Sequence, residues 1–194
     1  MRGYNSSSLR VSVLVVLLGF FVVALGATGS SLAAQASHEN RVPDQESVTR
    51  EVRHQLVMLP FYTLFDNLEY KVEGSKVTLM GEVVRPNLKD DAARAVKHVR
   101  GVETVDNQIK VLPLSPMDDQ LRRAEYRAIY SQPNLQMYAM QSVPPIHIIV
   151  DHGHVTLEGV VAKQADKDVA GIAAKGVPNV FSVTNNLRVE GGAK

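Results

Sequence analysis

Apolar and polar side chains alternate along two pairs of short segments, one pair in each half of the chain. The first pair is LEYKV and VTLMGEV, residues 68–72 and 77–83, and the second is IHIIV and VTLEGVV, residues 146–150 and 155–161. A period of two predicts half-buried β-strands. A glycine-containing tetrapeptide, EGSK or DHGH, separates each pair. These tetrapeptides predict hairpins, with a type II′ turn in the first and a type I′ turn in the second.

A helical period flanks each hairpin. Helices are predicted from Ser47 to about Leu59 and from Asp118 to about Tyr130, each ended by a nearby proline. Another helix follows each hairpin, and Asp166 is a candidate N-cap for the later one. The predicted core-facing positions of the four helices, in chain order, are Val48, Val52, Leu56 and Leu59; Leu88, Ala92, Ala95, Val96 and Val99; Leu121, Ala124 and Ala128; and Val169, Ala170, Ala173 and Val177.

The two sets of elements are copies of one unit, and a last strand, VDNQIKV or VTNNLRV, closes each copy. A shift of 78 residues aligns 68–111 with 146–189 without a gap, and 16 of the 44 positions are identical. Two copies favour tandem domains, because stacked repeat arrays need at least about three units. The sequence therefore predicts an α+β fold class, with two α-β-β-α-β two-layer sandwich domains at 46–112 and 117–190 and a linker at 113–116.

Residues 1–36 predict a signal peptide. Two arginines precede the uncharged segment 11–27, and small residues continue to AQA at 34–36, as signal peptidase requires. The alternative is a retained membrane anchor formed by 11–27, whose 17 residues are at the short limit for a span. The polar, proline-containing residues 37–45 then predict a linker.

Composition excludes several kinds of site. The chain has no cysteine, which rules out disulfide bonds, thiolate metal sites and cysteine nucleophiles. Its 21 basic and 20 acidic residues are interspersed, and loss of Arg2 and Arg10 with the signal changes the net charge from +1 to −1. Nucleic-acid binding needs a basic surface, so no nucleic-acid partner is predicted.

Candidate chemistry is sparse. His147, His152 and His154 lie beside Asp151 in one hairpin, but the equivalent EGSK turn has no metal ligands, so a solvated turn is favoured over a metal site. The acidic pair at 90–91 opens a predicted helix, where negative charge is favourable anyway. The chain has no nucleophile elbow, phosphate-binding glycine loop or HExxH motif. A non-enzymatic protein without a cofactor or resident metal is therefore predicted.

The pattern Val-Thr-Leu-x-Gly-x-Val, followed by an alanine-rich helix and GVETVDNQIKV, resembles the BON domain (bacterial OsmY and nodulation) over about 46–112 and 117–190. Tandem units behind a signal peptide are similar to the osmotically inducible periplasmic proteins. The resemblance implies residence in the periplasm, or anchoring to the inner membrane if 11–27 is retained, and association with phospholipid surfaces. The second copy departs from the pattern at Asn179, where the family has glycine. The family fingerprint positions are Gly81, Gly101, Val102, Gly159 and Val180.

The two copies differ most at 133–145, PNLQMYAMQSVPP, where the second has five extra residues. Methionine adapts to irregular partners, so the candidate lipid or protein contacts are Leu135, Met137, Tyr138 and Met140. The alternative is that this segment packs on the second sheet. The expected function is a non-enzymatic envelope protein that associates with phospholipid membrane surfaces or envelope proteins under osmotic or envelope stress. The rival is a periplasmic chaperone or interaction scaffold that uses this segment or a sheet edge.

Overall fold

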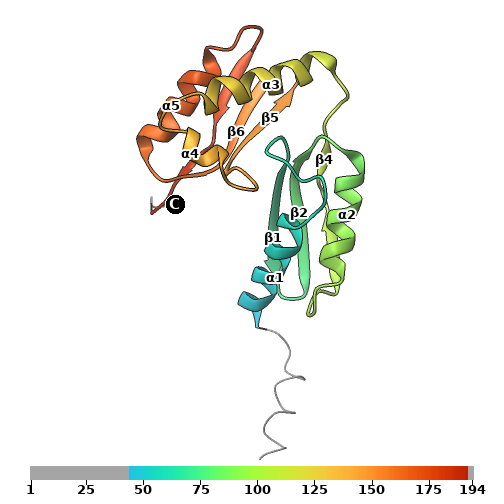
Figure 1. The fold of residues 1–194 in the computed structure, drawn as a ribbon. Coiled ribbons are helices and arrows are strands. Elements are labelled where there is room, and N and C mark those ends of the chain that lie inside the picture. Colours follow the sequence, from blue (N-terminus) through green and yellow to red (C-terminus); the bar gives the residue numbers. More distant parts are fainter. Residues whose placement is uncertain (1–43, 192–194) are drawn as a thin grey trace, which may run out of the picture. The chain divides into compact units, whose positions relative to one another are not determined.

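The computed structural model describes residues 44–191, which Figure 1 colours along the chain. The predicted signal peptide, its membrane-anchor alternative and linker residues 37–43 lie outside this range. Within 44–191, no helix is both long and apolar enough to cross a membrane. Asp44 and Gln45, which the sequence places in the linker, are instead the N-cap and first residue of a helix.

The described residues form two sheet-plus-helix units, here called repeat 1 and repeat 2, which confirms the predicted α+β class (Figure 1). Both follow the predicted element order, except that the last strand of each is split and repeat 2 has an additional short helix. The elements of repeat 1 are α1 (Gln45–Val57), β1 (Asn67–Glu73), β2 (Lys76–Val83), α2 (Pro86–Lys97), β3 (Thr104–Asn107) and β4 (Lys110–Val111). Those of repeat 2 are α3 (Pro116–Tyr130), α4 (Gln136–Ala139), β5 (Ile146–Asp151), β6 (His154–Val161), α5 (Gln164–Lys175), β7 (Ser182–Asn185) and β8 (Arg188–Val189).

The second strand of each hairpin is the centre of its sheet. In repeat 1, β1 pairs antiparallel with β2, and β3 and β4 pair parallel with the other side of β2. Repeat 2 has the same arrangement around β6. The hairpin turns have the predicted forms: Gly74 has φ +61°, whereas both His152 (+51°) and Gly153 (+79°) are left-handed. This topology leaves β1 and β5 as edge strands.

A repeated asparagine explains why each closing strand is split. The Nδ2 of Asn107 donates to the carbonyl of Lys89 in α2 at 2.9 Å, and its Oδ1 accepts from the Ile109 amide. Asn185 makes the equivalent bonds to Lys167 and Leu187. At this position the asparagine side chain, rather than the neighbouring strand, accepts the backbone amide hydrogen bond. The same side chain ties the closing strand to the preceding helix.

Each repeat has its own apolar core between its two helices and its sheet. The core of repeat 1 is formed by Val48, Val52, Leu56, Val77, Leu79, Val83, Leu88, Ala92, Val96, Val99 and Ile109. The predicted stripes of α1 and α2 are thus largely correct, although Leu59 and Ala95 are only partly buried. The buried apolar residues of repeat 2 are Leu121, Ile129, Tyr130, Leu135, Tyr138, Ile146, Ile148, Val150, Val155, Leu157, Val161, Ala170, Ala174, Val177 and Leu187.

The prediction for α3 was wrong in part. Of its three predicted core residues only Leu121 is fully buried, while Ala124 and Ala128 lie at the margin of the core. The helix instead buries a line that includes Glu125 and Ile129. Because Glu125 is charged, the spacing of apolar residues alone does not identify the buried face of α3.

The predicted cap of α5 is also corrected. The helix begins at Gln164 with Lys163 as its N-cap, so Asp166 lies in the first turn. The Asp166 side chain is buried and accepts a hydrogen bond from the Tyr138 hydroxyl at 2.7 Å. A carboxylate in the first turn remains favourable for the helix dipole, but its specific role is to hold Tyr138.

Candidate functional site

The strand glycines lie where two backbone segments approach closely. Gly81 has φ +102°, and a Cβ built on it would lie 2.1 Å from the Asn67 carbonyl oxygen. Gly159 has φ +121°, and its Cβ would lie 1.9 Å from the Pro145 carbonyl oxygen. A glycine inside a strand predicts either a bulge or a close backbone approach, and both positions have the close approach. These fingerprint residues therefore serve the fold.

The other fingerprint residues form the turn between the second helix of each repeat and its last strand. Gly101 has φ +93° and Asn179 has φ +67°, so asparagine keeps the left-handed turn in repeat 2. Val102 and Val180 follow and pack against the margins of their cores. These positions also supply turn geometry and packing.

The predicted contact residues at 135–140 divide into two pairs. Leu135 is fully buried and Tyr138 is 5% exposed, so neither side chain is available to a partner. The Tyr138 hydroxyl accepts from the Ala162 amide at 2.8 Å while it donates to Asp166. Met137 and Met140, by contrast, are 64% and 89% exposed. The candidate contact surface of this loop is therefore its two methionines.

Repeat 1 exposes apolar side chains in the same loop. Met58 is 67% exposed and Phe61 is 59% exposed. Phe61 has φ +69°, which is unusual for an aromatic residue, and the Arg85 guanidinium lies 5.0 Å from its ring centroid. Neither residue was predicted as a contact. Phe61 lies in the segment equivalent to 133–145, and Met58 is the C-cap of α1, just before it.

The histidines engage separate partners. The Nδ1 of His147 donates to the Asp66 carbonyl at 2.6 Å, and burial lowers the pKa of its imidazole. His152 lies 2.6 Å from the Asp151 carboxylate, and His154 lies against a serine hydroxyl. Among residues 44–191, no group of three or more His, Asp or Glu side chains is arranged to hold a metal ion.

A polar side chain at the start of the first helix of each repeat ties down the hairpin turn. In repeat 2, Asp118 is 1% exposed and accepts from the amides of His152 and Gly153 at 3.0 and 2.9 Å. In repeat 1, Gln45 binds the Gly74 amide and donates to the Val72 carbonyl. The repeat 2 contact is stronger because a carboxylate accepts both bonds.

Replacement of Asp118 by alanine is expected to lower the free energy of unfolding of repeat 2 by about 1 to 2 kcal/mol, because the partly buried His152 amide and the buried Gly153 amide lose their acceptor. Asp118→Asn should cost less, since an amide oxygen still accepts. Urea titrations followed by the NMR signals of Ile129 and Ile148 methyl groups measure this. Equal losses in both variants would contradict the hydrogen-bonding role.

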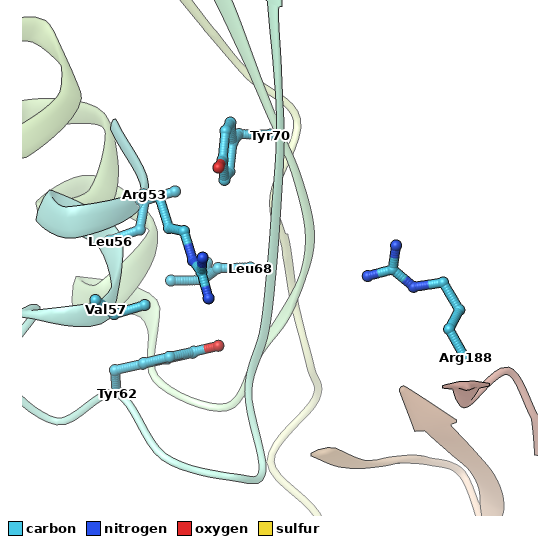
Figure 2. Close-up of a pocket in the computed structure, with 7 residues that line it drawn as sticks. All are labelled: Arg53, Leu56, Val57, Tyr62, Leu68, Tyr70 and Arg188. Atoms are coloured by element: carbon cyan, nitrogen blue, oxygen red, sulfur yellow. The ribbon is translucent and has the colours of Figure 1, made fainter. Parts of the chain in front are cut away.

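A groove lies along β1 in repeat 1, with a volume of about 400 Å³ (Figure 2). In this view Arg53 extends from α1 between the rings of Tyr62 and Tyr70. Burial raises the pKa of the Tyr62 phenol to about 12, so its hydroxyl stays protonated. The full lining is Arg53, Leu56, Val57, Tyr62, Leu68, Tyr70 and Arg188.

The groove combines apolar walls with unpaired positive charge. Among the described residues, neither Arg53 nor Arg188 has a carboxylate partner. Val57 and Leu68 supply apolar surface beside them. Sequence reasoning missed this site because its residues are distant in the chain and form no motif.

A second feature missed from the sequence is the carboxyl group of Glu125 in α3. The residue has no exposed surface, and neither carboxyl oxygen has a hydrogen-bond partner in the described structure. Burial raises the pKa of this carboxyl to about 7. An alignment of the first helices with an offset of 73 residues, five fewer than in the later elements, would place Glu125 opposite the buried Val52 and reveal it.

Three comparisons relate the chain to known proteins. It is 28% identical over 199 residues to osmotically-inducible protein Y of Escherichia coli (strain K12), with 93% of this chain and 98% of that protein covered. Two solved chains of CdsD, a structural protein of the Type III secretion system of Chlamydia trachomatis, align over 76% and 74% of this chain and 99% and 92% of their own. Their TM-scores are 0.28 and 0.27, at 12% and 11% identity. The model of the BON domain matches 44–113 and 134–191, more than half of the sequence, so the chain belongs to the BON domain family.

Proposed function

We propose that this protein is a non-catalytic envelope protein of the osmotic-stress response that associates with phospholipid membrane surfaces. Its similarity to an osmotically inducible protein along nearly the whole chain supports the cellular setting. The predicted export signal at 1–36 supports a place in the periplasm. The proposed contact is the loop that joins the first helix of each repeat to its first strand.

The observation that carries this proposal is the exposure of large apolar side chains from that loop in both repeats. Met58 and Phe61 are 67% and 59% exposed in repeat 1, and Met137 and Met140 are 64% and 89% exposed in repeat 2. Large apolar groups that protrude together from a folded surface are typical of membrane or partner contacts. Interfacial insertion would bury them among the headgroups and acyl chains.

The charge of the mature chain indicates how such association would occur. A net charge of −1 gives little overall attraction to anionic lipid. Binding would therefore depend mainly on apolar insertion and vary little with the anionic fraction of the membrane.

Binding, rather than catalysis, fits the placement of the buried carboxylates. Asp118 holds backbone amides and Asp166 holds the Tyr138 hydroxyl, while Glu125 is enclosed in the core. None of the three lines the groove beside β1. Asp118 and Asp166 therefore serve the fold, and Glu125 is closed off from solvent.

Co-sedimentation with vesicles of phosphatidylethanolamine and phosphatidylglycerol tests the proposal. The Met137→Ser/Met140→Ser double variant is expected to partition at least about tenfold less than the unaltered chain, because each buried methionine contributes on the order of 1 kcal/mol or more. Ile172→Ser is the matched control, since Ile172 is 71% exposed but lies on α5. No partition at any lipid composition, or equal losses in the variant and the control, would refute association through this loop.

A further inference from the structure

The outer edge of β5 in repeat 2 is covered. The Tyr130 hydroxyl donates to the Ile146 carbonyl at 2.9 Å, and an Arg122 guanidinium nitrogen donates to the Val150 carbonyl at 2.7 Å. Between them, the Ile148 amide donates to a backbone carbonyl at Leu64, in the loop before β1. The side chains of Ile146, Ile148 and Val150 are all fully buried. The outer edge of β5 is therefore closed by two side chains of α3 and by the backbone of the loop before β1.

The equivalent edge of β1 in repeat 1 is open in its centre, at Tyr70. Leu68, Tyr70 and Val72 occupy the matching positions, but all three are only partly buried. Gln45 covers the Val72 carbonyl. In the described structure, the Tyr70 amide and carbonyl have no hydrogen bond outside the β1–β2 hairpin. In α1, Thr49 stands in the place of Arg122 and Val57 in the place of Tyr130. Neither side chain is a long hydrogen-bond donor that could cover the strand edge.

We propose that the groove between α1 and the free edge of β1 binds an extended segment of a partner polypeptide that carries apolar side chains beside a carboxylate. Backbone groups of the segment would pair with those of Tyr70, as in other cases of strand addition. An apolar side chain would contact Val57, which is 43% exposed, and Leu68. The carboxylate would meet Arg53, which has no ion-pair partner among the described residues (Figure 2).

The occupied edge of repeat 2 indicates why a polypeptide fits better than a lipid. There the backbone carbonyl of Leu64 binds the strand edge, while the side chains of Leu64 and Phe65 pack against the repeat 2 core. A strand edge presents alternating donors and acceptors, which another backbone complements and a phospholipid headgroup does not. The groove volume of about 400 Å³ lies in the range of small binding sites. This surface is separate from the exposed methionines at 137 and 140 and goes beyond membrane association.

Fluorescence anisotropy with a labelled eight-residue peptide tests this inference, using alternating valine and threonine with one central aspartate. Binding to the full chain is expected, and methylation of alternate backbone nitrogens should weaken it at least about tenfold by removing hydrogen bonds. Arg53→Glu should weaken binding of the unmethylated peptide about tenfold. Arg50→Glu is the matched control, because Arg50 is exposed on α1 but already paired with Glu46.

The position of binding is read from NMR shifts, which should be largest at the amides of Leu68 and Tyr70. Absence of binding, or unchanged affinity after backbone methylation, would overturn the proposal. Displacement of the peptide by inorganic phosphate would also overturn it and identify an anion site instead.

Discussion

Replacement of Gly159 by alanine is expected to lower the free energy of unfolding of repeat 2 by about 3 to 4 kcal/mol, or to prevent its folding. Two causes act together. The backbone has φ +121°, a conformation closed to residues with a Cβ, and that Cβ would lie 1.9 Å from the Pro145 carbonyl oxygen. Relief would require the β5–β6 hairpin to separate at the start of β5, where Ile146 is fully buried.

The effect should be confined to one repeat. Urea titration followed by isoleucine methyl NMR separates the two, because Ile109 lies in the core of repeat 1 and Ile148 in that of repeat 2. Gly81→Ala should act in the same way on Ile109, since its Cβ would lie 2.1 Å from the Asn67 carbonyl oxygen. Gly74→Ala is the control for backbone strain alone: it has φ +61° with no atom within 4 Å, so a smaller loss of about 1 to 2 kcal/mol is expected. Similar losses for Gly74 and Gly159 would mean that close approach contributes little.

These glycines show why the fold was predictable from the sequence. A glycine weakens an otherwise regular alternating strand, so each of these glycines indicated a bulge or a close backbone approach. The hairpins, their turn types and the helices were predictable for a related reason, because periodicity and turn chemistry are local. The break in each last strand was not predictable, since it depends on a hydrogen bond from Asn107 or Asn185 to the preceding helix.

The candidate sites were less accessible to sequence reasoning. The two methionines at 137 and 140 were identified, but their neighbours Leu135 and Tyr138 share the same composition and are buried. Which face of a four-residue helix is exposed depends on tertiary packing, and Tyr138 is held inward by Ala162 and Asp166. The open edge of β1 was missed because it results from the absence of long donor side chains on α1. Thr49 and Val57 stand where Arg122 and Tyr130 of α3 cover the edge of β5.

Glu125 is expected to make the stability of repeat 2 depend on pH, and its replacement by leucine should remove that dependence. The carboxyl group has no exposed surface and no hydrogen-bond partner within the described residues, although Arg122 on the same helix is also buried with its Nε unpaired. Burial therefore raises the pKa of Glu125 from 4.5 to about 7.

The direction follows from proton binding. Below pH 4.5 the carboxyl is protonated in both the folded and unfolded states, so ionisation costs no stability. Between pH 4.5 and about 7 the unfolded chain ionises while the folded chain stays protonated, so the free energy of unfolding falls as pH rises. Above about pH 7 the carboxyl is ionised in both states, so the free energy of unfolding stays lowered by the full amount and changes no further with pH.

The measurement is the difference in unfolding free energy between Glu125→Leu and the unaltered chain at pH 5 and pH 8, from urea titration of the Ile129 and Ile148 methyl signals. The stabilisation by leucine is expected to be about 2 kcal/mol greater at pH 8 than at pH 5. Glu51→Leu serves as control, because Glu51 is exposed on α1 and its removal should have nearly the same effect at both values. If the gain from leucine at position 125 were equal at the two pH values, Glu125 would have to be ionised in the folded chain at pH 5 as it is in the unfolded chain, and its pKa would not be raised by burial.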